Sequence, residues 1–102
     1  MDLKQKIRNL IQSGYIEGEL QVDPLWYILW KPEELEQFNL EYNFKDYAPE
    51  FIGFGDSGSN ELLAVNNAGE IFTLPAIGME SRYAVKIANS FDELTKLMVK
   101  TN

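Results

Sequence analysis

Hydrophobic residues near the N-terminus recur at the spacing of one face of an α-helix. The repeating positions are Leu3, Ile7, Leu10 and Ile11. This spacing fits the 3.6-residue period of a helix that buries one side and exposes the other. Asp2 is suited to cap the first turn, and Gly14 is suited to end the helix. The pattern therefore predicts an amphipathic helix over residues 2–13.

The pattern then changes to the two-residue alternation of β-strands. In residues 15–22, the positions expected on the buried face are Ile16, Leu20 and Val22. Asp23-Pro24 interrupts the alternation, because proline removes a backbone donor. Residues 25–30 form a continuous hydrophobic run, which is typical of a more buried strand. The two segments are predicted to pair as a hairpin.

A second helix is predicted to begin at Lys31-Pro32. Proline suits the first helical turn, and the acidic residues that follow complement the positive end of the helix dipole. The positions expected to face inward are Leu35, Phe38 and Leu40. Residues 43–47 are predicted to form a loop.

The second half of the chain predicts three strands, at residues 51–54, 61–65 and 71–74. Their connections are short and rich in glycine and asparagine, so neighbouring strands should be antiparallel. Residues 75–82 form either a loop or a bulge that leads into another strand at 83–87.

The last predicted element is a helix that begins with a capping box. Ser90 is the expected N-cap, and Glu93 follows it by the three residues that this motif requires. The expected buried stripe is Phe91, Leu94, Leu97 and Met98.

Composition narrows the class of protein. The chain has 102 residues, which predicts a single domain over 1–102. It has no cysteine and no histidine, so disulfides, thiolate zinc sites and histidine-dependent catalytic triads are excluded. No signal peptide and no hydrophobic run long enough to cross a bilayer is visible, so a cytoplasmic protein without membrane contact is expected.

Charge is concentrated in the middle third. The formal net charge is -7, and residues 31–61 hold eight acidic and two basic residues. An acidic surface repels phosphates, which disfavours nucleic-acid binding, and it attracts basic proteins. Solubility alone is the simpler explanation of such charge.

The sequence gives little support for a catalytic, phosphate-binding or metal-binding motif. The glycine-rich residues 53–58 lack the following lysine of a phosphate-binding loop, and a strand rather than a helix is expected next. The polar residues Asp56, Ser57, Ser59, Asn60 and Glu61 do not have EF-hand spacing. Carboxylate pairs such as Glu33 and Glu36 are explained by the helix dipole. We therefore expect no catalytic residues, no cofactor and no metal.

Aromatic residues cluster in the same acidic part of the chain and just before it. They are Trp26, Tyr27, Trp30, Phe38, Tyr42, Phe44 and Tyr47. Most are expected in the core, but exposed ones would suit a protein interface, where aromatic side chains are enriched.

From Trp26 onward, the order of segments resembles the SUKH superfamily, which comprises fungal cell-wall-assembly regulators and many bacterial immunity proteins. The segments that carry the resemblance are the helix start 32–35, residues 48–55, 58–65 and 67–71, the stretch 74–79, and the closing helix start 87–94. They cover about three-quarters of the chain. The N-terminal part is shorter than is usual in the family, whose Leu-Pro and tyrosine helix and Asn-Gly-Gly turn are missing.

The resemblance implies an α+β fold with a central, mostly antiparallel sheet and N-terminal, middle and C-terminal helices packed on it. It also implies a non-catalytic protein that binds and neutralises a cognate toxin, often a nuclease. Charge, rather than the family, suggests the contact residues Glu33, Glu34, Glu36, Glu41, Asp46 and Asp56. A regulatory or scaffold domain without a toxin, a small-molecule or enzymatic role, and a monomer or a dimer all remain open at this point.

Overall fold

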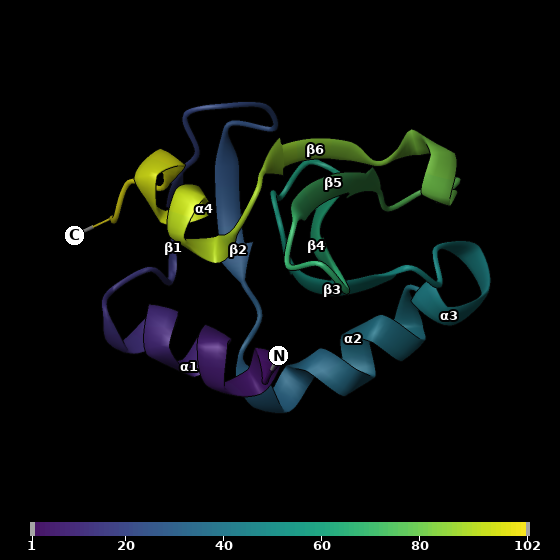
Figure 1. The fold of residues 1–102 in the computed structure, drawn as a ribbon, viewed down its shortest axis with the longest axis horizontal. Helices are drawn as coiled ribbons and strands as arrows, with labels where there is room; N and C mark the ends of the chain where they lie inside the picture. Colours follow the sequence, from purple (N-terminus) through teal and green to yellow (C-terminus); the bar gives the residue numbers. More distant parts are fainter. Residues whose placement is uncertain (1, 102) are drawn as a thin grey trace.

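The fold is a six-stranded antiparallel sheet with helices packed against it (Figure 1). The computed structural model describes residues 2–101. The strands neighbour one another in chain order: β1 (Glu17–Glu19), β2 (Trp26–Leu29), β3 (Phe51–Asp56), β4 (Glu61–Asn66), β5 (Ile71–Pro75) and β6 (Val85–Ala88). The helices are α1 (Leu3–Gln12), α2 (Leu35–Glu41), α3 (Phe44–Tyr47) and α4 (Phe91–Leu97), with 3-10 turns η1 (Pro32–Glu34) and η2 (Ser81–Tyr83). The expected α+β class is confirmed.

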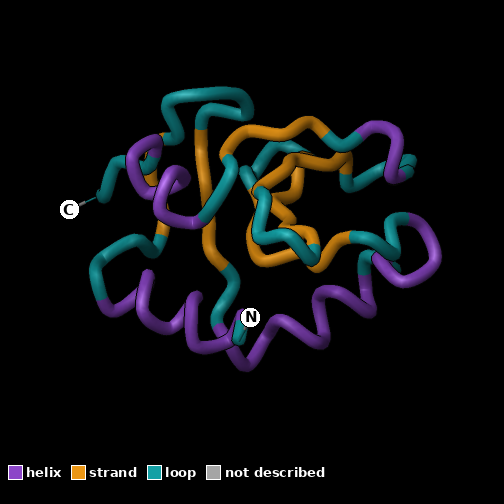
Figure 2. Tube along the Cα trace, viewed as in Figure 1, coloured by secondary structure: helices purple, strands orange, loops and turns teal. Residues whose placement is uncertain are grey.

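The sheet curls, so that β3 to β6 wrap around part of the interior (Figure 1). The two long helical segments, α1 and the run from η1 through α2, lie along one side of the molecule (Figure 2). α4 contacts β6, and the chain after it reaches β1 through a bridge between Met98 and Leu20. Because other strands and helices lie against β4 on several sides, its residues Leu62 to Val65 are all buried.

The N-terminal helix forms where the hydrophobic period predicts it. The Asp2 carboxylate accepts a hydrogen bond of 3.1 Å from the Gln5 backbone N–H and so caps the first turn. Ile7 and Leu10 are buried. Gly14 follows the helix with a φ of 99°, a left-handed conformation that glycine adopts without steric cost.

The Asn39 side chain fastens α2 to β3. Its Nδ2 donates to the Leu35 carbonyl oxygen at 2.8 Å and to the Gly53 carbonyl oxygen at 2.9 Å, and its Oδ1 accepts from the Gly53 N–H at 2.8 Å. A Cβ at Gly53 would lie only 2.7 Å from Cζ of Phe44. Asn39 therefore holds α2 against β3, and the glycine at position 53 leaves room for the Phe44 ring of α3.

Three local predictions in the first half of the chain are wrong. Leu40 is 77% exposed because it lies about 140° around the helix from Leu35, the residue that faces the core. Ile16 is 56% exposed because β1 begins only at Glu17, so the alternation does not extend back to it. Residues 43–47 are not a loop. Asn43 adopts a left-handed φ of 59° that redirects the chain, and the short helix α3 follows and buries Phe44.

The start of the last helix follows the predicted signal. The Ser90 hydroxyl accepts from the Glu93 backbone N–H at 3.1 Å. The Glu93 carboxylate accepts from the Asn89 backbone N–H at 3.3 Å, one residue before the position that a standard capping box uses. Phe91, Leu94 and Met98 are buried as expected, whereas Leu97 is only partly buried.

An ion pair joins β6 to the turn before β5, where Lys86 Nζ lies 2.6 Å from Glu70 Oε2. The hydrogen bond from Lys86, and then that from Asn66, holds the pKa of Glu70 below its ordinary value near 4.5. A lowered folded-state pKa contributes stability above pH 4.5 that is lost as the pH falls through the folded-state value.

Glu70→Gln should therefore lose less stability than the wild type when the pH falls from 6 to 3. Lys86→Met should have the same effect, because it removes the donor that lowers the Glu70 pKa. Urea unfolding of the three proteins at both pH values measures the difference. Identical acid dependence in all three would show that this pair does not contribute.

Candidate protein-binding surface

Five of the six candidate carboxylates lie in the helical segment between β2 and β3. This acidic helical segment comprises residues 32–47 and carries Glu33, Glu34, Glu36, Glu41 and Asp46. The sixth, Asp56, is the last residue of β3. The structure therefore places five of them on three consecutive short helical elements, η1, α2 and α3, at the edge of the molecule, and the chain changes direction at Asn43 between α2 and α3 (Figure 1).

Three of these side chains have partners within the same part of the fold. Glu34 accepts from the Lys31 backbone N–H at 3.0 Å, which caps η1. Glu41 accepts from Gln37 Nε2 at 3.3 Å. Glu36 lies 3.5 Å from Lys4 Nζ, with both side chains more than half exposed, so this ion pair contributes little to stability.

Glu33 and Asp46 differ from these three. Both side chains are exposed, and neither makes a side-chain hydrogen bond or an ion pair to any residue between 2 and 101. The two carboxylates are therefore free to meet a basic partner.

The Asp56 side chain stabilises the structure of the chain itself. Its carboxylate accepts from Trp30 Nε1 at 3.4 Å and from the Gly58 backbone N–H at 2.8 Å, so it orders the turn between β3 and β4. It lines a shallow hollow together with Tyr42. Because both of its oxygens accept hydrogen bonds within the chain, Asp56 is the weakest of the six candidates for partner contact.

Of the seven aromatic residues of this region, three are buried in the core, namely Tyr27, Trp30 and Phe44, and Trp26 is partly buried. Trp30 is buried and stacks against Tyr42 at 5.8 Å between ring centroids, with Phe38 at 4.9 Å. Phe38 and Tyr42 are partly buried, whereas Tyr47 at the end of α3 is 56% exposed. Tyr47 adjoins Asp46, so an exposed aromatic ring accompanies a free carboxylate there.

A hydrophobic groove runs beside the acidic helical segment. Two adjoining hollows of about 490 and 470 Å³ share Glu36, Asn39 and Ile52. Their remaining lining comes from α1, α2, α3 and β3 and includes Leu3, Leu40, Pro49 and Phe51. We call this surface the α2–β3 groove. Its exposed hydrophobic residues are Leu40 and Ile52, at 77% and 49%.

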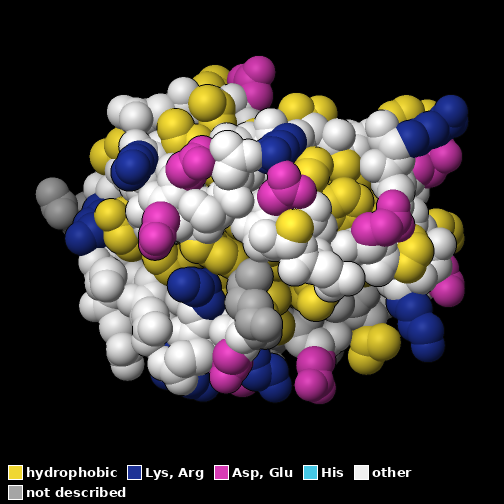
Figure 3. All heavy atoms as spheres, in the orientation of Figure 1, with side chains coloured by type: hydrophobic (Ala, Val, Ile, Leu, Met, Phe, Trp, Pro, Cys, Tyr) yellow, Lys and Arg dark blue, Asp and Glu magenta, His cyan; other side chains and the backbone are white. Residues whose placement is uncertain are grey.

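Charged residues border the α2–β3 groove on several sides. Glu36 lies between the two hollows, Lys45 lines one of them, and Asp2 and Lys4 line the other. A hydrophobic floor with a charged rim is the arrangement of protein–protein interfaces. In the view of Figure 3, acidic and basic side chains are interspersed, and hydrophobic side chains lie between them in groups.

The sequence did not predict this groove. Leu40 was expected inside, and the strand predicted at 51–54 came with no expectation about whether the Ile52 side chain would be exposed. The helical angle between Leu35 and Leu40 is a signal that could have placed Leu40 outside. Nothing local to Ile52 indicates that its side chain would be half exposed.

Two further observations concern metal binding and membrane-spanning helices. Among residues 2–101, no three histidine, cysteine, aspartate or glutamate side chains come together as a group that could hold a metal ion. In the same part of the chain, every helix is too short or too polar to cross a membrane.

Sequence comparison adds no relative to these observations. No protein-family model matches the chain, and no curated protein is significantly similar to it.

Proposed function

We propose that this protein is a non-catalytic protein-binding domain that neutralises a basic toxin, such as a nuclease, in the cytoplasm. The observation that carries the proposal is the exposed α2–β3 groove directly beside the acidic helical segment. The SUKH resemblance of the sequence supports the toxin as the class of partner. A nuclease needs positive charge to bind nucleic acid, so an acidic inhibitor suits it.

The two parts of the surface would act at different stages of binding. Glu33 and Asp46 are exposed and unpaired in the described structure, so they would attract a basic partner and raise its association rate. Leu40 and Ile52 would then be buried on contact, and burying a side chain of this size contributes roughly 1.5–3 kcal/mol. Occlusion of the toxin would follow from binding alone.

The test is capture of the partner with the tagged full-length chain, followed by measurement with the purified pair. We expect a basic toxin domain that binds in equal proportion and loses its activity in the complex. A captured protein that keeps its activity, or that is acidic, would contradict the proposal.

Charge reversal tests the electrostatic part. Replacing Glu33 and Asp46 with lysine should lower the association rate with a basic partner about tenfold or more at low salt, and should weaken its dependence on salt. Stopped-flow binding at several ionic strengths measures this. The matched control is Asp92 of α4 and Glu19 of β1 replaced with lysine, which gives the same net charge on other elements; both are exposed, and neither side chain has a hydrogen bond or an ion pair to residues 2–101. Equal slowing by the two pairs would show that only net charge matters.

A further inference from the structure

The outer edge of β6 has no partner in the described structure. β6 is the last strand of the sheet, and outside its pairing with β5 no backbone hydrogen bond reaches Val85–Ala88 from residues 2–101. The opposite edge is different, since the Val99 N–H donates to the Glu19 carbonyl oxygen at 2.9 Å and Thr101 Oγ1 donates to the Glu17 carbonyl oxygen. The C-terminal segment therefore covers β1 and leaves β6 free.

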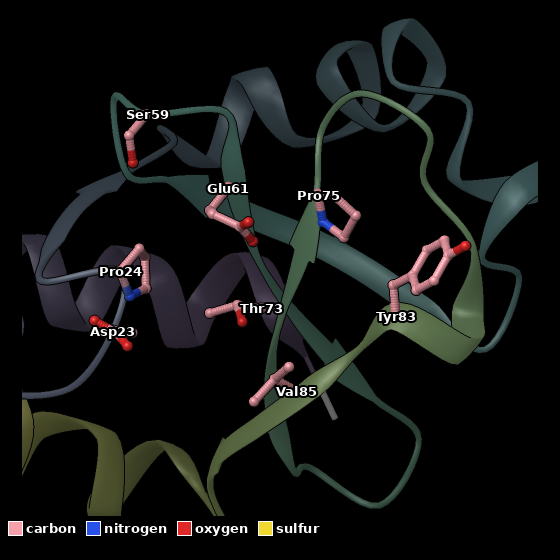
Figure 4. Close-up of a pocket in the computed structure, with 8 residues that line it drawn as sticks. All are labelled: Asp23, Pro24, Ser59, Glu61, Thr73, Pro75, Tyr83 and Val85. Carbon is pink, nitrogen blue, oxygen red and sulfur yellow. The ribbon is translucent and has the colours of Figure 1, made fainter.

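A hollow of about 660 Å³ adjoins this edge (Figure 4). Its walls are Thr73 and Pro75 of β5, Val85 of β6 and Tyr83 of η2, and Asp23-Pro24 closes it from the β1–β2 turn. The Glu61 carboxylate and the Thr73 hydroxyl point toward the middle of this ring of residues (Figure 4). The lining of the hollow therefore combines hydrophobic residues, such as Pro75 and Val85, with the polar groups of Glu61 and Thr73.

The charge of the hollow is negative. It is lined by two carboxylates, Asp23 and Glu61, and by no lysine or arginine. Neither carboxylate forms an ion pair with a residue between 2 and 101. Two carboxylates that line a hollow with hydrophobic walls and form no ion pair fit a long basic side chain, whose carbon stem contacts the walls while its head reaches a carboxylate oxygen.

We propose that β6 accepts an extended segment of a partner protein as a seventh strand, with a lysine or arginine of that segment in the hollow. An added strand would lie about 4.8 Å from β6 and would take its affinity from backbone hydrogen bonds. Its side chains alternate between the two faces, so every second one lies on the face of Val85 and Thr73, which border the hollow. The charge of that side chain supplies the specificity.

A second copy of this chain is a poorer occupant. Each copy carries a net charge of -7, and the lysine that a second β6 would bring, Lys86, is already paired with Glu70. The site is separate from the α2–β3 groove, and it does not require that the proposed toxin partner exist.

Random eight-residue peptides displayed on phage and selected on the full-length chain are the probe. We expect enriched peptides in which β-branched or aromatic residues alternate and one fixed position is lysine or arginine. A synthetic copy of such a peptide should slow hydrogen exchange at backbone amides within Val85–Ala88. Glu61→Gln and Asp23→Asn should each weaken its binding about fivefold or more, whereas Glu33→Gln should leave it unchanged.

Four results of the peptide experiments would overturn the inference, and a fifth would come from the protein alone. The four are the absence of any enriched peptide, enrichment without a basic position, exchange protection that falls on Ile52 or α2 instead of β6, and equal binding to wild type and Glu61→Gln. A concentration-dependent dimer that protects the same β6 amides without peptide would also overturn it, because the occupant would then be a second copy. Failure of the toxin proposal would leave these measurements unaffected, since they use no toxin.

Discussion

Replacing Gly18 with alanine should lower the free energy of unfolding by about 2–4 kcal/mol, the largest stability effect that we expect from a single added methyl group. A Cβ at Gly18 would overlap the Val99 carbonyl oxygen and come within 3.1 Å of Tyr27 Oη. Gly18 does not have a positive φ, so alanine is compatible with its backbone conformation. The cost would come from contact with the C-terminal segment.

That segment is held by several bonds that the added methyl group would break. The Val99 N–H donates to the Glu19 carbonyl oxygen, the Gln21 N–H donates to the Leu97 carbonyl oxygen at 2.8 Å, and Tyr27 Oη donates to the Val99 carbonyl oxygen at 3.1 Å. Tyr27 is fully buried, so loss of its hydroxyl partner is costly. Since about 1 kcal/mol changes the Tm of a domain this size by roughly 4–8 °C, a decrease of about 8–30 °C is expected.

Thermal unfolding followed by circular dichroism measures this decrease. The control is the same substitution in a chain that ends at Met98, where the oxygen that would clash is absent. If the clash is the cause, Gly18→Ala should be nearly neutral in the shortened chain. An equal decrease in both chains would mean that Gly18 matters for a reason other than Val99.

Gly18 also illustrates which parts of this fold the sequence could predict. Signals that act within a few residues gave correct elements, such as the cap at Ser90, the hydrophobic period of α1 and the antiparallel strands from Phe51 onward. The reason for a glycine at position 18 lies 81 residues away, at Val99. No pattern around Gly18 contains that information.

The wrong local predictions also concern residues whose structure depends on contacts far along the chain. Asn43 and Phe44 form the start of a helix because the phenylalanine ring packs beside Gly53, a contact across the fold. Asn39, which looks like an ordinary polar helix residue, bonds to both backbone groups of Gly53. Both contacts join α2 or α3 to β3, and the secondary-structure propensities of the nearby residues do not indicate them.

The candidate protein-binding surface was also predictable from the sequence only in part. Charge clustering is visible in the sequence, and five of the six proposed carboxylates do lie in one helical segment. The α2–β3 groove beside them is not visible there, because it depends on how α1, α2 and β3 meet. Asp56 was selected by charge alone, and its two internal hydrogen bonds could only be found in the structure.

Replacing Leu40 with aspartate should weaken binding of the proposed toxin partner about 10–100-fold while leaving the domain folded. Leu40 is 77% exposed and lines the α2–β3 groove, so it is the side chain best placed to be buried by a partner. Loss of a central hydrophobic contact in an interface costs roughly 2 kcal/mol or more. The effect should fall mainly on the dissociation rate, because short-range contacts determine how long a complex lasts.

Ile77→Asp is the matched control. Ile77 is 76% exposed, and its replacement adds the same negative charge, but it lies in the loop after β5 and lines neither hollow of the groove. Ile77→Asp should unfold within about 0.5 kcal/mol of the wild type, because surface substitutions rarely cost more. Leu40→Asp should cost about 1 kcal/mol, because an acidic residue in the last turn of α2 opposes the helix dipole. Surface plasmon resonance with the purified partner then compares the dissociation rates. Faster dissociation for Leu40→Asp alone would place the partner on the α2–β3 groove, whereas equal behaviour of the two variants would exclude it from that surface.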